Sequence, residues 1–145
     1  MLIREVLSVK SGMEVISVAP ETSAAEAVAR MVEHDIGSLA VMKAGAMVGF
    51  VTERNILRGV HARACTLTDI EVAQLMERAP LVATPDDSAD YAREAMTKSH
   101  TSHLVVLDDG KLFGILSFHD LARAYLKDVN FENALLKRYI KNWPE

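Results

Sequence analysis

The chain has 145 residues, of which 50% are hydrophobic and 25% are charged. This length suits one ordinary domain or two small units that share a core, and the composition excludes a disordered chain. Sixteen Lys and Arg residues against 20 Asp and Glu residues leave a formal net charge of −4, which argues against a general nucleic-acid binder.

Cysteine content and apolar runs narrow the class further. Cys65 is the only cysteine, so neither a disulfide within the chain nor a thiolate zinc cluster can form. No apolar run approaches the roughly 20 residues that span a bilayer, and residues 1–5 lack the layout of a signal peptide. The five histidines show no metal-ligand spacing. We therefore expect a soluble cytoplasmic protein without a metal site, a membrane contact or a nucleic-acid partner.

The first half of the chain predicts one strand–helix–strand–strand–helix unit that follows a short helix. Capping residues and apolar periodicity mark the helices, and short apolar runs around a glycine turn mark the hairpin. The expected strands cover 15–18, 38–42 and 47–51, and the expected helices cover 3–7 and begin at Ser23 and Thr52.

The second half repeats this order at an offset of 65 residues. The segment Gly49-Phe50-Val51-Thr52-Glu53-Arg54-Asn55-Ile56 is similar to Gly114-Ile115-Leu116-Ser117-Phe118-His119-Asp120-Leu121, and identities continue through both halves without a gap. The strands should cover 81–83, 103–107 and 112–116, with helices at 72–76 and beginning at Ser88 and Ser117. Two α/β modules packed on each other are the expected architecture.

The expected division of the chain follows the repeat. Repeat 1 covers 1–62, a linker covers 63–69, repeat 2 covers 70–127, and a C-terminal helical tail covers 128–145. Within the tail, residues 130–143 predict a separate helix with aromatic and leucine residues at four-residue steps. This helix is expected to pack on its own core or on a second copy of the chain.

The duplicated strand end carries the candidate chemistry. Thr52-x-x-Asn55 and Ser117-x-x-Asp120 each end a strand and open a helix. The first backbone N–H groups of a helix lack partners within the helix and favour an anion. A hydroxyl could donate to a phosphate, and the Asp120 carboxylate could accept both hydroxyls of a ribose. The same pattern is also an N-terminal cap, and the sequence leaves that alternative open.

Basic residues accompany both motifs. Arg54 and His119 occupy equivalent positions, as do Arg58 and Arg123. Residues four apart share a helix face, so each repeat would place basic side chains beside its hydroxyl, where a phosphate needs a counter-charge. A solvated helix face is the competing interpretation.

These motifs, in tandem and each preceded by a capped helix and a hairpin, resemble a pair of CBS domains, also called a Bateman module. The resemblance covers nearly all of residues 1–127, and residues 132–140 add a likeness to stand-alone bacterial two-repeat proteins. It implies α/β (α+β) βαββα repeats that are related by a pseudo-twofold axis and packed through their small sheets, plus a C-terminal helix. It also implies a homodimer, and a cleft that binds an adenosine compound such as AMP, ADP, ATP, NAD(H) or S-adenosylmethionine.

Transferred by position, the resemblance implies a nucleotide site from both repeats. In repeat 1 the implied residues are Val18, Ala19, Pro20, Ser38, Leu39, Thr52, Arg54 and Asn55. In repeat 2 they are Thr84, Pro85, His103, Leu104, Ser117, His119 and Asp120. The family usually has Asp where this chain has Asn55, and an amide has one acceptor oxygen instead of two. We therefore expect repeat 2 to hold a ribose more firmly.

The leading functional hypothesis is a non-catalytic sensor that binds an adenine nucleotide, forms a homodimer and regulates an unidentified protein in trans. No catalytic residue and no catalytic cofactor are predicted. The alternative is a structural dimerisation module whose cleft stays empty because its hydroxyls only cap helices. An enzyme acting on nucleotides is a third possibility, without a water-activating carboxylate pair to support it.

Overall fold

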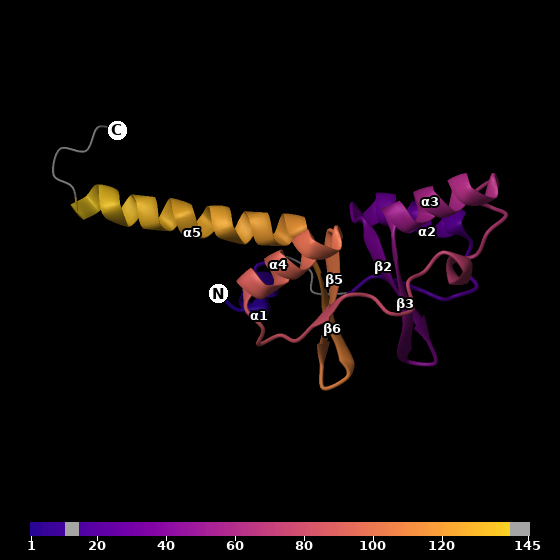
Figure 1. The fold of residues 1–145 in the computed structure, drawn as a ribbon, viewed down its shortest axis with the longest axis horizontal. Coiled ribbons are helices and arrows are strands. Elements are labelled where there is room, and N and C mark those ends of the chain that lie inside the picture. The colour runs from indigo at the N-terminus through magenta and orange to yellow at the C-terminus, as the bar shows by residue number, and fades with distance from the viewer. Residues whose placement is uncertain (11–14, 140–145) are drawn as a thin grey trace.

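Each half of the chain folds into a three-stranded sheet with its own helices (Figure 1), in a computed structural model that describes residues 1–10 and 15–139. In the first half the strands are β1 (Ser17–Val18), β2 (Ser38–Lys43) and β3 (Ala46–Thr52), with helices α2 (Ala24–His34) and α3 (Glu53–Arg63). In the second half they are β4 (Val82–Ala83), β5 (His103–Asp108) and β6 (Lys111–Ser117), with helices α4 (Ala89–Ser99) and α5 (Phe118–Tyr139). The predicted α/β repeat is confirmed.

The two sheets have the same topology and the same register. β1 pairs with β2 in parallel and β2 pairs with β3 antiparallel, and β4, β5 and β6 repeat this order. Ser38 pairs with Thr52, and their equivalents His103 and Ser117 pair in the same way. Both hairpins turn through a glycine with positive φ, Gly45 or Gly110, in the left-handed region that glycine adopts without steric cost. The 65-residue offset therefore holds at the level of individual backbone pairs.

Helix starts follow the capping residues expected from the sequence. The Ser23 hydroxyl accepts a hydrogen bond from the Glu26 N–H, and the Ser88 hydroxyl accepts one from the Tyr91 N–H. Each bond satisfies a backbone donor that has no partner within its helix. The two caps place α2 and α4 at the same point of the two repeats.

Each core contains the segment that precedes the other unit in the sequence. Helix α1 (Ile3–Ser8) buries Ile3, Val6 and Leu7 in the core of the second unit. The segment around a 3₁₀ turn at Val72–Gln74 contributes Ile70, Val72 and Leu75 to the core of the first unit. The two units are therefore interlocked, because each loses part of its core if the preceding segment of the other is removed.

Backbone bonds show that these two leading segments are equivalent. The Ile3 N–H donates to the Asp87 carbonyl at 2.9 Å, and the Val72 N–H donates to the Thr22 carbonyl at 2.8 Å. The two donors, Ile3 and Val72, lie 69 positions apart, whereas the two acceptors keep the 65-residue offset. The difference arises because the segment between the leading helix and the first strand is longer in the first half of the chain. Residues 11–14 of that segment fall outside the described residues.

The units meet through their hairpins, which stand side by side near the middle of the molecule in Figure 1. The ring of Phe50 in β3 packs against the ring of His103 in β5, with centroids 6.2 Å apart. Phe50 also pairs with Glu77 through two backbone hydrogen bonds, which cover the free edge of β3. The segment before the second repeat thus protects this edge strand from open solvent.

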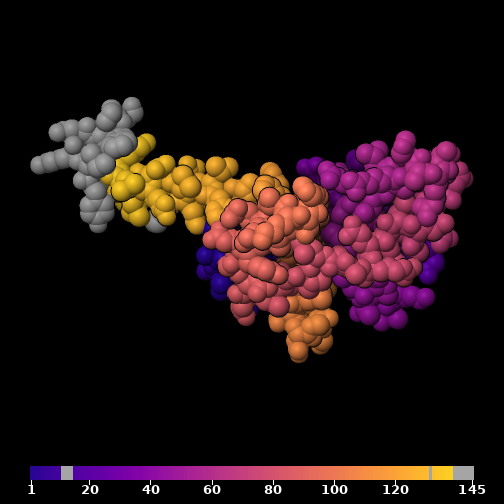
Figure 2. All heavy atoms as spheres, in the orientation of Figure 1, coloured from indigo at the N-terminus to yellow at the C-terminus, as the bar shows by residue number. Residues whose placement is uncertain are grey.

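The C-terminal helix is present, but it is not separate from the last helix of the second repeat. Helix α5 runs continuously over Phe118–Tyr139, because no glycine or proline interrupts this stretch. The rest of the predicted tail helix, 140–143, lies outside the described residues. Figures 1 and 2 show α5 projecting beyond the body of the molecule, and its Leu135 and Leu136 are exposed instead of packed on the chain's own core.

Among residues 1–10 and 15–139, no helix combines the length and the apolar character that crossing a bilayer requires.

Candidate ligand-binding site

The two duplicated motifs lie where a strand ends and a helix begins, as the sequence predicts. Thr52 ends β3 and caps α3, while Ser117 ends β6 and directly precedes α5. The hairpin register places Ser38 beside Thr52 and His103 beside Ser117. The structure therefore brings the central predicted residues of each repeat together, and the two sites can be compared atom by atom.

In the first repeat the two motif residues hydrogen-bond mainly to each other. The Thr52 hydroxyl accepts from the Asn55 N–H at 3.1 Å and donates to Asn55 Oδ1 at 2.9 Å. Asn55 Oδ1 also accepts the Thr52 N–H, and Asn55 Nδ2 donates to Glu77 Oε1 at 3.1 Å. Here the capping interpretation is confirmed, because the polar groups of both side chains form hydrogen bonds within the protein.

In the second repeat the same cap leaves groups available. The Ser117 hydroxyl accepts from the Asp120 N–H at 3.0 Å, and Asp120 Oδ2 accepts the Ser117 N–H at 2.9 Å. Among the described residues, the Ser117 hydroxyl hydrogen and Asp120 Oδ1 have no partner. A hydroxyl can still donate and a carboxylate oxygen can still accept. This site therefore offers both functions that a phosphate and a ribose require.

Lys10, which follows α1, completes this second site. Its Nζ donates to Asp120 Oδ2 at 2.9 Å and to the Ile115 carbonyl at 3.1 Å. Lys10 is not among the site residues predicted from the sequence. Its only sequence signal is a cation at the end of a leading helix, and nothing in that pattern points to a contact 110 positions away.

The surroundings keep Asp120 ionised. Burial is the largest single influence and raises the pKa of Asp120, whose side chain is only 7% exposed, but the Ser117 N–H and the Lys10 ammonium together outweigh burial. The pKa of Asp120 therefore lies below its ordinary value. A carboxylate held as an anion suits a hydrogen-bond acceptor for hydroxyl groups.

His103 lies between the two helix starts. Burial lowers the pKa of the His103 imidazole, and the nearby Lys10 ammonium lowers it further, while Glu53 and Asp120 act in the opposite direction. The ring contacts Phe50 across the two units and its Nδ1 lies 3.1 Å from the Ser102 hydroxyl. At neutral pH this imidazole is therefore uncharged.

The lowered pKa of His103 predicts a pH dependence of stability. As pH falls below the ordinary pKa of 6.5, the unfolded chain takes up a proton that the folded chain resists, so stability decreases. The lowered pKa of Asp120 acts in a separate window, at pH values below its ordinary 3.8. We expect His103→Gln to lose less stability than the natural chain between about pH 7.5 and about pH 5. Urea unfolding of both proteins at the two pH values measures this, and equal losses would exclude His103 as the cause.

The other predicted residues divide into three groups. The side chains of Val18, Leu39 and Leu104 lie in the hydrophobic cores, so they can offer a ligand only backbone groups. Pro20 and Pro85 are buried beside the exposed Ala19 and Thr84. Arg54 and His119 are exposed at the first turns of α3 and α5, where they can reach a ligand at the helix start.

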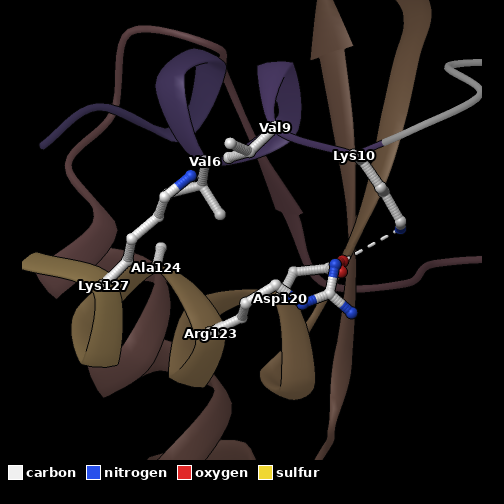
Figure 3. Close-up of a pocket in the computed structure, with 7 residues that line it drawn as sticks. All are labelled: Val6, Val9, Lys10, Asp120, Arg123, Ala124 and Lys127. Atoms are coloured by element: carbon white, nitrogen blue, oxygen red, sulfur yellow. Dashed lines mark hydrogen bonds and ion pairs between the residues drawn. The ribbon is translucent and has the colours of Figure 1, made fainter.

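Two pockets each contain one of the predicted site residues, Asp120 or Pro20. One of about 100 Å³ is lined by residues of α1 and α5 and includes Lys10 and Asp120 (Figure 3). The other, of about 380 Å³, lies on the first unit and is lined by Pro20, Met76 and Arg78, among others. In the part of the chain that the structure describes, His, Cys, Asp and Glu side chains form no group of three that could hold a metal ion.

Comparison with known proteins identifies the family to which the two repeats are similar. The chain matches the family model of the CBS domain twice, over residues 3–62 and 72–127. The mitochondrial CBS domain-containing protein CBSX3 of Arabidopsis thaliana is 30% identical over 121 residues, which cover 80% of this chain and 59% of that protein. The chain therefore spans less than two thirds of this relative's length.

Solved structures agree with the fold. The crystal structure of the CBS domain protein NE2398 has a TM-score of 0.81 at 29% identity and covers 87% of this chain and 98% of that chain. Two more distant structures carry adenosine ligands. The structure of CBSX2 in complex with AMP has a TM-score of 0.70 at 24% identity and covers 87% of this chain and 96% of that chain. The structure of the MJ0100 CBS pair with 5-methylthioadenosine and S-adenosyl-L-methionine has a TM-score of 0.74 at 23% identity and covers 88% of this chain and 98% of that chain.

Two family matches that cover both repeats agree with the duplicated register and the duplicated helix starts. The chain belongs to the CBS-domain family and is a tandem pair of CBS domains.

Proposed function

We propose that this protein is a non-catalytic regulatory module that binds an adenine nucleotide, with its stronger site in the second repeat. The observation that carries the proposal is the pair of available groups at the start of α5, the Ser117 hydroxyl hydrogen and Asp120 Oδ1. The hydroxyls of a ribose would donate to Asp120, and a phosphate oxygen would accept from Ser117. The adenosine ligands of the CBSX2 and MJ0100 structures support this ligand class.

A binding role is favoured over catalysis by the state of the carboxylate. A general acid or base works best with a pKa near the working pH. At Asp120 the hydrogen bonds and charge from Ser117 and Lys10 outweigh the effect of burial, so its pKa lies below the ordinary value and far from neutral pH. The ion pair with Lys10 holds this carboxylate in place as an acceptor. The residue is therefore suited to grip hydroxyl groups and not to move protons at neutral pH.

The proposal includes a homodimer that acts on a partner protein in trans. A nucleotide at the start of α5 contacts the helix that projects from the body, so binding can bias the position of a surface that another chain sees (Figure 1). Such regulation requires unequal affinity of the nucleotide for two arrangements. Analytical ultracentrifugation that returns a single chain at working concentrations would remove the homodimer from this proposal.

Thermal unfolding with a panel of adenosine compounds tests the binding function. A compound present at about 100 times its dissociation constant adds about 2.7 kcal/mol of stability, which for a chain of this size raises Tm by roughly 5–10 °C. The panel contains adenosine, AMP, ADP, ATP, NAD⁺ and S-adenosylmethionine, with guanosine monophosphate as the control. A Tm that no compound moves would favour the alternative, a dimerisation module whose two caps serve only the helices.

A further inference from the structure

The pocket beside Asp120 is lined by several positively charged side chains, and most of them form no ion pair within the described part of the chain. Its lining includes Lys10, Arg123 and Lys127 together with Asp120 (Figure 3). Lys10 is paired with Asp120, whereas Arg123 and Lys127 have no hydrogen-bond or ion-pair partner among residues 1–10 and 15–139. The pocket lining therefore holds two positively charged side chains that are not neutralised by a partner within the described part of the chain.

Helix stability does not explain this arrangement. Arg123 and Lys127 lie four positions apart on α5, and like charges at that spacing destabilise a helix. They also lie in the N-terminal half of a 22-residue helix, and the helix dipole favours cations only near the C-terminus. An anion between the two side chains would remove their repulsion.

The shape of the pocket indicates which part of a ligand it takes. Its volume of about 100 Å³ is well below the roughly 300–1,000 Å³ of pockets that enclose a whole small molecule. Figure 3 shows Lys10 and Arg123 extending toward Asp120 at one end, while Lys127 extends toward Val6 at the other. Cations at both ends of a small pocket fit a chain of phosphate groups that begins beside Asp120.

The first repeat lacks this set. Arg58 is the equivalent of Arg123, but Ala62 stands at the position of Lys127 and Asn55 at that of Asp120. Outside the motif, the side-chain partner of Asn55 is the acid Glu77, whereas the side-chain partner of Asp120 is the Lys10 ammonium. The concentration of positive charge therefore occurs in the second repeat alone, although both repeats have the same fold.

We propose that Arg123 and Lys127, with Lys10, form a phosphate subsite that makes the second-repeat site selective for nucleotides with a phosphate chain. Neutral adenosine lacks the group that this subsite holds, and the positively charged S-adenosylmethionine is repelled by it. The inference rests on the proposed function, because it assumes that the ribose is held at Asp120. It goes further in naming the charge of the ligand and the residues that select it.

Titration calorimetry on the full chain tests this selectivity with two matched double variants. Arg123→Gln with Lys127→Gln removes the subsite, and Lys137→Gln with Arg138→Gln removes the same charge from the exposed end of α5. We expect the natural chain and the control to bind ADP more tightly than AMP, and AMP more tightly than adenosine. The subsite variant should lose about tenfold or more in ADP affinity, the size of one charge-assisted hydrogen bond, with adenosine affinity unchanged.

The outcomes separate this inference from the proposed function. If adenosine binds the natural chain as tightly as ADP, or if the subsite variant binds ADP like the control, the phosphate subsite is wrong and the nucleotide function stands. If no adenosine compound binds but inorganic pyrophosphate binds the natural chain and not the subsite variant, the subsite stands and the nucleotide function is wrong. If neither pyrophosphate nor any adenosine compound binds, both are wrong.

Discussion

Replacing Asp120 by alanine is expected to weaken AMP binding by about 10- to 100-fold, whereas Asn55→Ala should change it by less than about threefold. A hydrogen bond to a charged group is worth roughly 1.5–3 kcal/mol, and about 1.4 kcal/mol corresponds to tenfold in affinity. Asp120 Oδ1 is available to hydroxyl donors, while both polar atoms of the Asn55 side chain are already bonded to Thr52 and Glu77. Titration calorimetry of both variants measures the difference.

The control for this experiment addresses the helix cap. Asp120 Oδ2 accepts the Ser117 N–H, so alanine removes a cap as well as a ligand contact, at a cost to stability of about 1 kcal/mol. Asp120→Asn keeps an acceptor for that N–H and loses the charge, so it should fold normally and still bind AMP weakly. Equal losses from the Asp120 and Asn55 variants would contradict the assignment of the stronger site to the second repeat.

Replacing Ile3 by alanine is expected to cost about 2–5 kcal/mol of unfolding free energy, and the damage should fall on the second repeat. Ile3 is fully buried, and it packs in the core that also contains Leu104 and Leu116. The lost methyl groups leave a cavity that a close-packed core fills only partly. Urea unfolding measures the loss, and amide hydrogen exchange locates it by faster exchange in β4–β6.

A reciprocal variant checks the interlocked arrangement. Val72 is fully buried in the core of the first unit, although it stands at the start of the second repeat in the sequence. Val72→Ala should therefore speed hydrogen exchange in β1–β3, opposite to the effect of Ile3→Ala. If each variant instead loosened the repeat that follows it in the sequence, the cores would not be assembled as described.

Local sequence patterns predicted the repeat because both copies contain the same short-range interactions. The caps at Ser23 and Ser88, the glycine turns and the motif strands all depend on neighbours a few positions away, which a sequence shows directly. The strands and the glycine turn of the hairpin were predicted, whereas the pairing of Ser38 with Thr52 became visible only in the structure. The capping alternative at Thr52 was visible in the sequence, but whether its hydroxyl kept a free hydrogen depended on the orientation of Asn55.

Contacts between distant segments decided the rest. The placement of α1 on the second unit and of residues 70–75 on the first follows from burying apolar side chains where space exists, which no local pattern reports. Lys10 reaches Asp120 only because α1 is packed there, and that packing also encloses the cationic pocket. By itself, the sequence determined two similar units and a duplicated helix start, because strand and helix propensities are local. The tertiary structure decided which start keeps available polar atoms and positive charge, because that depends on which distant segment fills the neighbouring space.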